Sequence, residues 1–217
     1  MSSDFSPAER AAVYRVIRSR RDVREQFVGD DVSEVLLARV LEAAHCAPSV
    51  GFSQPWRFIV VRELATRTAV YEAFLAANDA ASRIYSGARA EHYRALRLQG
   101  ILSAPVNICV VCEQKPERGN GLGRQTMPET VNYSTVCAIQ NLWLAARVEG
   151  LGVGWVSIAE PQALRDIFCV PATAGIVAYL CLGFVSAFRD EPDLQRADWE
   201  RRLPLEDVIH RERYGAK

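Results

Sequence analysis

The segment Tyr133–Ile158, with the sequence YSTVCAIQNLWLAARVEGLGVGWVSI, decides the fold class because a long helix runs directly into a glycine-rich strand. Apolar spacing predicts the helix over Tyr133–Glu149, closed by Gly150, since glycine commonly follows the last turn of a helix. The strand is predicted over Gly152–Ile158. Dinucleotide-binding folds of the Rossmann type need the reverse order, with glycines that follow a strand and open a helix. The segment therefore disfavours a Rossmann-type fold.

The rest of the chain predicts helices and short strands in irregular alternation. Ser6-Pro7-Ala8-Glu9 is a capping box with proline at the first helical position, so a helix begins there and extends to about Ser19. Ser33 opens a second helix, which ends before Pro48. The other expected helices span Leu64–Ala77, Ala88–Leu102 and Pro161–Phe168, and the other expected strands span Trp56–Val61, Val106–Glu113 and Ile176–Phe184. A polar segment around Asn78–Gly87 is expected to separate two of these helices. The pattern indicates an α+β sandwich around one central sheet.

The composition is that of a folded chain with a single domain over residues 1–217. Apolar residues make up 49% of the sequence and charged residues 24%, a balance that disordered chains do not have. Lys plus Arg equals Asp plus Glu, at 26 each. No overall basic field therefore favours nucleic acid as a partner.

Neither export nor membrane insertion is predicted. The N-terminal sequence MSSDFSPAER lacks a basic region followed by an apolar stretch. The most apolar segments, Val106–Cys112 and Gly175–Val185, are much shorter than the roughly 20 residues that span a bilayer. We therefore expect a cytoplasmic protein.

The cysteines are expected to be reduced residues of the core, because most of them lie in apolar runs. They are Cys46, Cys109, Cys112, Cys137, Cys169 and Cys181. Cys109 and Cys112 have the spacing of a redox pair, but positions three apart in a strand face opposite sides of the sheet. His45 and the other histidines lack the spacing of zinc ligands. The sequence predicts no metal site.

A cluster of arginines follows the first predicted helix. Arg18, Arg20, Arg21 and Arg24 lie close together around Asp22. Such a run is either a solvated surface or an anion site, since guanidinium groups bind phosphate through two parallel hydrogen bonds. In an extended segment Arg20, Asp22 and Arg24 point the same way, because side chains alternate. A carboxylate between two guanidinium groups would be held in its ionised form.

Two loops are further candidates for a binding site. The segment Ala47–Trp56 contains Pro48, Ser49 and Gly51, and it is either an ordinary turn or a loop in which glycine lets a flat ligand approach the backbone. The segment Lys115–Thr130 is a long loop, of a kind that is often functional.

Together these motifs resemble the nitroreductase flavoprotein family. The basic pentad Arg20–Arg24, the loop of Pro48-Ser49 and Gln54-Pro55-Trp56, and the glycine-rich turn Gly150–Trp155 occur in the family's order. The resemblance covers about residues 10–190. It implies an α-β-α sandwich with a central mixed sheet of four strands, and a homodimer with FMN at the subunit interface. It also implies a tail, residues 190–217, that wraps around the partner.

Two positions narrow the resemblance to the flavin-destructase branch of this family. Asp22 stands where ordinary members carry serine, and Phe52 stands where they carry asparagine. The branch implies that reduced FMN is a substrate, fragmented with O2 to 5,6-dimethylbenzimidazole, the lower ligand of vitamin B12, and a tetrose phosphate. A separate NAD(P)H flavin reductase would supply the reduced FMN. An FMN-retaining NAD(P)H nitroreductase and a flavin-binding protein without turnover are the alternative functions.

The resemblance also implies roles for particular residues. Asp22 would be the base or proton shuttle beside the ribityl hydroxyls, and Ser157 would hydrogen-bond the isoalloxazine edge or the oxygen adduct. The expected FMN contacts are Arg20, Arg21, Asp22, Val23, Arg24, Pro48, Ser49, Gly51, Ser157 and Arg189. The segment Asn78–Gly100 is a candidate lid.

Overall fold

Four strands form one sheet in the spatial order β1-β2-β4-β3. The computed structural model describes residues 4–115 and 117–216. The strands are β1 (Trp56–Val61), β2 (Val106–Glu113), β3 (Leu151–Val156) and β4 (Ala174–Phe184). Two strands begin and end where the sequence predicts, at Trp56–Val61 and Val106–Glu113, because both are rich in β-branched and other apolar residues.

The expectation of a mixed sheet is wrong for these four strands, because every neighbouring pair is antiparallel. Strands β2 and β3 do run in the same direction, as expected when a helix connects them. They are not neighbours, however, since β4 lies between them and runs the opposite way. Parallel pairing occurs only as an isolated bridge between Asp22 and Val153 among the described residues.

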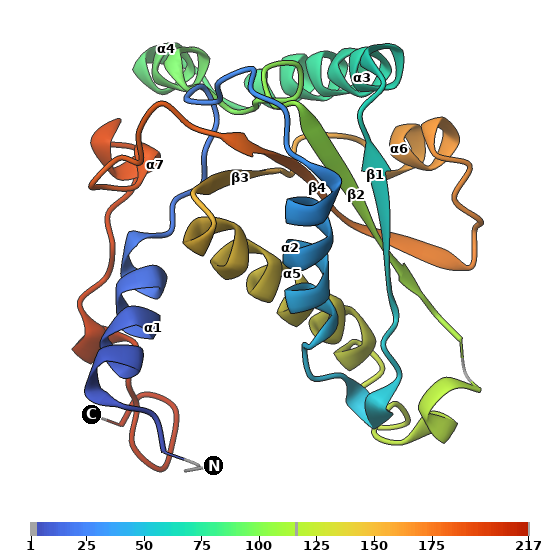
Figure 1. Cartoon of the computed structure of the whole chain (residues 1–217). Coiled ribbons are helices and arrows are strands. Elements are labelled where there is room, and N and C mark those ends of the chain that lie inside the picture. The colour runs from blue at the N-terminus through green and yellow to red at the C-terminus, as the bar shows by residue number, and fades with distance from the viewer. Residues whose placement is uncertain (1–3, 116, 217) are drawn as a thin grey trace.

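Helices cover both faces of the sheet (Figure 1). They are α1 (Pro7–Ser19), α2 (Glu34–His45), α3 (Leu64–Ser82), α4 (Gly87–Ala95), α5 (Thr130–Val148), α6 (Pro161–Ile167) and α7 (Asp193–Arg196). Short 3-10 turns are η1 (Val50–Phe52), η2 (Arg118–Gly121) and η3 (Leu205–Asp207). The predicted capping box at Ser6 and the cap at Ser33 are both present.

The side chains of β2 show why the sheet is buried on both faces. Ile108 and Val110 pack in the cluster that contains α2 and α5. Cys109 and Val111 point the other way, into the cluster that contains α3 and α6. This alternation confirms the predicted α-β-α sandwich.

The segment between the third and fourth helices differs from the prediction. Helix α3 continues through Asn78 to Ser82, since the polar residues there are flanked by alanines that favour helix. Helix α4 then ends at Ala95 rather than at Leu102. The chain becomes extended at Leu96, which brings Ile101 into the core as a fully buried residue.

The pentad Arg20–Arg24 docks on the free edge of β3. The amide N–H of Val23 donates to the carbonyl of Val153 at 3.0 Å. A Cβ atom at Gly154 would collide with the Val23 carbonyl oxygen, and one at Gly152 would collide with the Val23 side chain. The glycines of β3 therefore permit close approach of a second chain segment, a role that strand glycines often have.

Within the described residues, no helix combines the length and the apolar character that crossing a membrane requires.

We predict that Gly154→Ala destabilises the protein by displacing the pentad from β3. The added methyl group meets backbone atoms, which cannot move as a flexible side chain can, and overpacking of this kind costs about 1–3 kcal/mol of unfolding free energy. Urea denaturation measures the effect.

Gly175→Ala is the matched control for this prediction. Gly175 also lies in a strand, but a Cβ atom there meets nothing within 4 Å. Its unfolding free energy should stay within about 0.5 kcal/mol of the wild-type value. Equal losses in the two variants would contradict the docking of the pentad as the cause.

Candidate active site

The last turns of helix α5 hold the start of the pentad. The indole N–H of Trp143 donates to the carbonyl of Arg21 at 3.0 Å, and Arg147 Nε donates to the carbonyl of Ser19 at 3.2 Å. The Arg20 guanidinium lies over the Trp143 ring, 4.8 Å from its centroid, where cation–π attraction favours it. The pentad is thus fixed by α5 on one side and by β3 on the other.

The Asp22 carboxylate is oriented by one donor from β3 and one from the pentad itself. Its Oδ1 accepts the amide N–H of Trp155 at 2.9 Å, and its Oδ2 accepts Arg24 Nη2 at 2.7 Å. A second nitrogen of Arg24 donates to the carbonyl of Arg97 at 3.0 Å. The expected placement of Asp22 between two guanidinium groups is only half met. Arg24 pairs with it, whereas the Arg20 guanidinium lies over the Trp143 ring and forms no ion pair with a described carboxylate.

Two pentad residues hold the segment in place. The Arg21 guanidinium donates to the carbonyls of Arg18, Arg20 and Asp190. The Val23 side chain is buried against the sheet. Their expected contact with FMN stays a prediction, whereas their contact with the rest of the chain is direct.

A large cleft lies between the end of α1 and the tail. Its volume is about 820 Å³. It is lined by Ile17, Arg18, Arg20, Arg21, Asp190, Glu191, Pro192, Gln195, Asp198, Arg201 and Arg202. A neighbouring cleft of about 210 Å³ shares Arg20, Arg21 and Arg202 with it and contains Asp22. Asp22 retains 32% of its side-chain exposure, so its carboxylate is accessible from this second cleft.

Both clefts are lined by arginines and carboxylates together, with Asp190, Glu191 and Asp198 in the larger and Asp22 and Asp193 in the smaller. Among the described residues, no carboxylate lies within ion-pair distance of Arg20 or Arg202. Burial lowers the pKa of the Arg20 guanidinium, while the neighbouring Asp22 carboxylate raises it. The positive charges of Arg21 and Arg202 lower this pKa further. An anion bound between Arg20 and Arg202 would relieve that repulsion.

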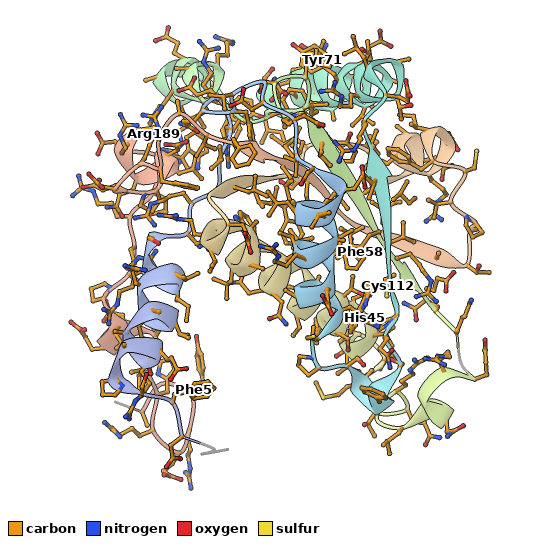
Figure 2. All side chains as sticks on the ribbon, viewed as in Figure 1. Phe5, His45, Phe58, Tyr71, Cys112 and Arg189 are labelled. Carbon is orange, nitrogen blue, oxygen red and sulfur yellow. The ribbon has the colours of Figure 1, made fainter. Side chains whose placement is uncertain are left out.

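Arg189, which was expected to contact FMN, forms ion pairs within the chain instead of lining the clefts. Arg189 pairs with Glu25 at 2.8 Å and with Asp193 at 3.1 Å, and it lines neither of the two clefts. Figure 2 shows it beside α7. The tail arginines that do face the pentad are Arg201 and Arg202, which sequence reasoning missed. The pair of adjacent arginines before Leu203-Pro204 indicated a local positive charge in the tail. Charge alone, however, does not predict which tail arginine faces the cleft.

Ser157 is exposed and follows the last residue of β3, because the strand ends at Val156 rather than at Ile158. It lies two residues after Trp155, whose amide binds Asp22, so the Cα atoms of Trp155 and Ser157 are at most about 7 Å apart. The docking of the pentad therefore brings Asp22 and Ser157 to the same edge of the sheet.

The loop of Pro48, Ser49 and Gly51 lies at the opposite end of α5. The amide of Val50 donates to Ser134 Oγ at 3.0 Å, whereas the pentad binds Trp143. These two helix residues are nine positions apart, which corresponds to about 14 Å along the axis. Figure 2 shows the same separation, with His45 near this loop and Arg189 near α7. One chain does not bring the two groups of predicted site residues together.

Comparison with known proteins accounts for the combination of fold, pentad and glycine-rich strand. The model of the nitroreductase family matches residues 17–184. The chain belongs to the nitroreductase family. Its membership confirms the resemblance read from the motifs, since all three motifs lie within the matched residues.

Relatives within the nitroreductase family are similar over nearly the whole chain. A 5,6-dimethylbenzimidazole synthase of Rhodospirillum rubrum is 44% identical over 92% of this chain and 94% of its own length. A protein of the same name from Rhodobacter capsulatus is 43% identical over 94% of this chain and 98% of its own length. A crystal structure of iodotyrosine deiodinase bound to FMN and 3-iodo-L-tyrosine superposes with a TM-score of 0.71. It is 19% identical, covers 93% of this chain and 98% of its own, and shows the shared nitroreductase fold.

The cysteines of this nitroreductase-family chain only partly follow the prediction. Cys109, Cys112 and Cys181 are buried and free, but Cys46, Cys137 and Cys169 are exposed, so the expectation of core positions is wrong for those three. Cys109 and Cys112 face opposite sides of β2, as predicted. Burial raises the pKa of the Cys109 and Cys181 thiols to about 12 and also raises that of Cys112. These thiols are therefore protonated and unreactive at neutral pH.

In the described part of the chain, no three His, Cys, Asp or Glu side chains gather as a metal site requires.

Proposed function

We propose that this chain is a cytoplasmic 5,6-dimethylbenzimidazole synthase, which fragments reduced FMN with O2 to the benzimidazole and a tetrose phosphate. The observation that carries the proposal is the Asp22 carboxylate, held by Trp155 and Arg24 at the edge of an arginine-lined cleft. The names of the relatives that are 44% and 43% identical support it.

The arginines of the clefts fit the phosphate of FMN. Arg20 and Arg202 approach the same space from the pentad and from the tail. Two guanidinium groups without carboxylate partners suit a phosphate dianion, which accepts several charge-assisted hydrogen bonds. In this arrangement Arg20 and Arg202 bind the phosphate, and the ribityl chain runs past Asp22.

Asp22 is suited to move a proton at a ribityl hydroxyl. The hydrogen bond from the Trp155 amide and the ion pair with Arg24 fix the carboxylate in one orientation. Each carboxylate oxygen accepts more than one hydrogen bond, so both oxygens remain able to accept a proton from the substrate. Breaking a ribityl carbon–carbon bond needs such a base. Reduced flavin, when bound, supplies the electrons that activate O2 and the carbon atoms of the product.

Ser157 is the second residue assigned to the reaction. Its hydroxyl is exposed at the end of β3, on the edge of the sheet where Asp22 lies. There it donates a hydrogen bond to the isoalloxazine edge.

A separate NAD(P)H flavin reductase supplies the reduced FMN in this proposal. A flavin that is consumed must be replaced at every turnover, so its reduction is best completed before it binds here. The chain then needs to recognise only the reduced flavin and O2.

A homodimer completes the site. Helix α1 has no buried residue, and its apolar side chains Val13, Tyr14 and Ile17 are exposed. Helix α5 likewise exposes Tyr133 and Val136. Apolar stripes of this kind mark interfaces. Pairing two copies along α5 lets the Pro48-Ser49-Gly51 loop of one protomer approach the pentad of the other. The whole tail, residues 190–217, was expected to wrap around the partner; because Trp199 packs on Arg89 of its own chain, we assign this role to the residues beyond 202.

The direct test is incubation of the purified protein with photoreduced FMN, followed by air and by chromatography of the products. We expect 5,6-dimethylbenzimidazole to form without any nicotinamide. Recovery of intact oxidised FMN alone would contradict the proposal. Rapid NAD(P)H oxidation with a nitroaromatic acceptor would instead identify an FMN-retaining nitroreductase, and flavin release without turnover would identify a flavin-binding protein.

The dimer is tested by Val136→Glu, which places a charge in the exposed stripe of α5. Burying an unpaired carboxylate at an interface is costly, so light scattering should report a monomer and FMN binding should be lost. Ala76→Glu, at an exposed position of α3, is the control and should remain dimeric. A dimeric Val136→Glu protein with normal FMN affinity would exclude this interface.

A further inference from the structure

Trp199 joins the tail to helix α4. Its ring lies under the Arg89 guanidinium, 3.7 Å from that group to the ring centroid. Tyr85 and His92 each approach it edge to face, with ring centroids 5.5 Å away. The His92 ring also hydrogen-bonds the carbonyl of Ala197. A large aromatic side chain of the tail is thus enclosed by residues of α4 and of the turn before it.

The same stretch of tail carries the arginines of the cleft. Arg201 and Arg202 follow Trp199 by two and three residues. The turn between them and α7 is held by the Trp199 amide, which donates to Leu194 at 2.9 Å, and by the Arg202 amide, which donates to Gln195 Oε1 at 3.4 Å. The position of the Trp199 ring therefore sets where the Arg202 side chain begins.

The chain just after helix α4 is bound to the pentad. The carbonyl of Arg97 accepts the hydrogen bond from Arg24, and the Arg97 side chain lies 3.6 Å from the Glu25 carboxylate. Since Arg24 is the ion-pair partner of Asp22, α4 is connected to the carboxylate through Arg97. It is connected to Arg202 through Trp199. Figure 1 shows α4 and α7 on the same side of the molecule.

We propose that Trp199 is a positioning residue that holds Arg202 on the substrate phosphate by anchoring the tail to α4, so that the preference for a phosphorylated flavin depends on this aromatic contact. The inference rests on the proposed function for the identity of the flavin. Arg202 does the binding, and Trp199 acts through it. Loss of the Trp199 ring frees the turn, and Arg202 then loses its fixed position in the cleft.

The test compares binding of oxidised FMN and of riboflavin, which lacks the phosphate, by quenching of flavin fluorescence. The wild-type protein should prefer FMN. Trp199→Ala should reduce this preference about tenfold, the factor expected for losing one charge-assisted hydrogen bond, mainly through weaker FMN binding. Trp199→Phe, which keeps a ring under Arg89, should retain most of the preference. Tyr214→Ala, an exposed aromatic position elsewhere in the tail, is the control and should behave as wild type.

A double variant separates positioning from general destabilisation. If Trp199 acts through Arg202, Trp199→Ala combined with Arg202→Ala should lower the FMN preference no further than Arg202→Ala alone. Arg89→Ala removes the ring's partner on α4 without changing the tail and should lower the same preference, which keeps the test valid if Trp199→Ala does not fold.

Equal weakening of FMN and riboflavin binding in Trp199→Ala would overturn the inference, because a merely structural role affects both ligands alike. A wild-type protein without preference for FMN would overturn it as well. Neither readout depends on turnover. Failure of the proposed reaction would appear instead as a normal FMN preference without benzimidazole formation.

Discussion

The site depends on the docking of Arg20–Arg24 against the free edge of β3. The bridge between Asp22 and Val153, with its hydrogen bond from the Val23 amide to the Val153 carbonyl, sets the register, and Gly152 and Gly154 leave the space that the segment needs. Once the register is set, the Trp155 amide faces the Asp22 carboxylate. The edge of the sheet, which would otherwise expose unpaired backbone groups, orients the Asp22 carboxylate.

The docking of the pentad also determines which arginines of the clefts have partners within the chain. Arg21 and Arg24 are engaged by carbonyls and by Asp22, whereas Arg20 and Arg202 line the same cleft without a carboxylate partner among the described residues. The pentad therefore pairs with the edge of β3 and, in the proposed function, supplies one half of the phosphate site. Helix α4 and the residues just after it contact both the pentad and the tail, since Arg97 binds Arg24 and Arg89 packs against Trp199.

Local patterns predicted the parts of this structure that depend on nearby residues. The Ser6 capping box and the strands Trp56–Val61 and Val106–Glu113 are determined within a few positions. Features set by tertiary packing were missed: β4 inserts between β2 and β3 and makes the sheet antiparallel, and Arg189 pairs with Glu25 while Arg202 faces the cleft. Asp22 was found because its residue type is unusual in the motif, but its bond to Trp155 required the fold. The expected roles of Ser49, Gly51 and Ser157 stay predictions.

The variant Asp22→Asn tests the central claim most directly. Its amide oxygen would still accept the hydrogen bond from the Trp155 amide, and Arg20 and Arg202 would be unchanged, so FMN affinity should stay close to that of the wild type. Benzimidazole formed per reduced FMN should fall at least about a hundredfold, the contribution typical of a positioned base. Asp166→Asn removes an exposed carboxylate of α6 that binds Gln162, and it should keep the wild-type yield. A wild-type product yield from Asp22→Asn would show that the carboxylate is only a structural partner of Arg24.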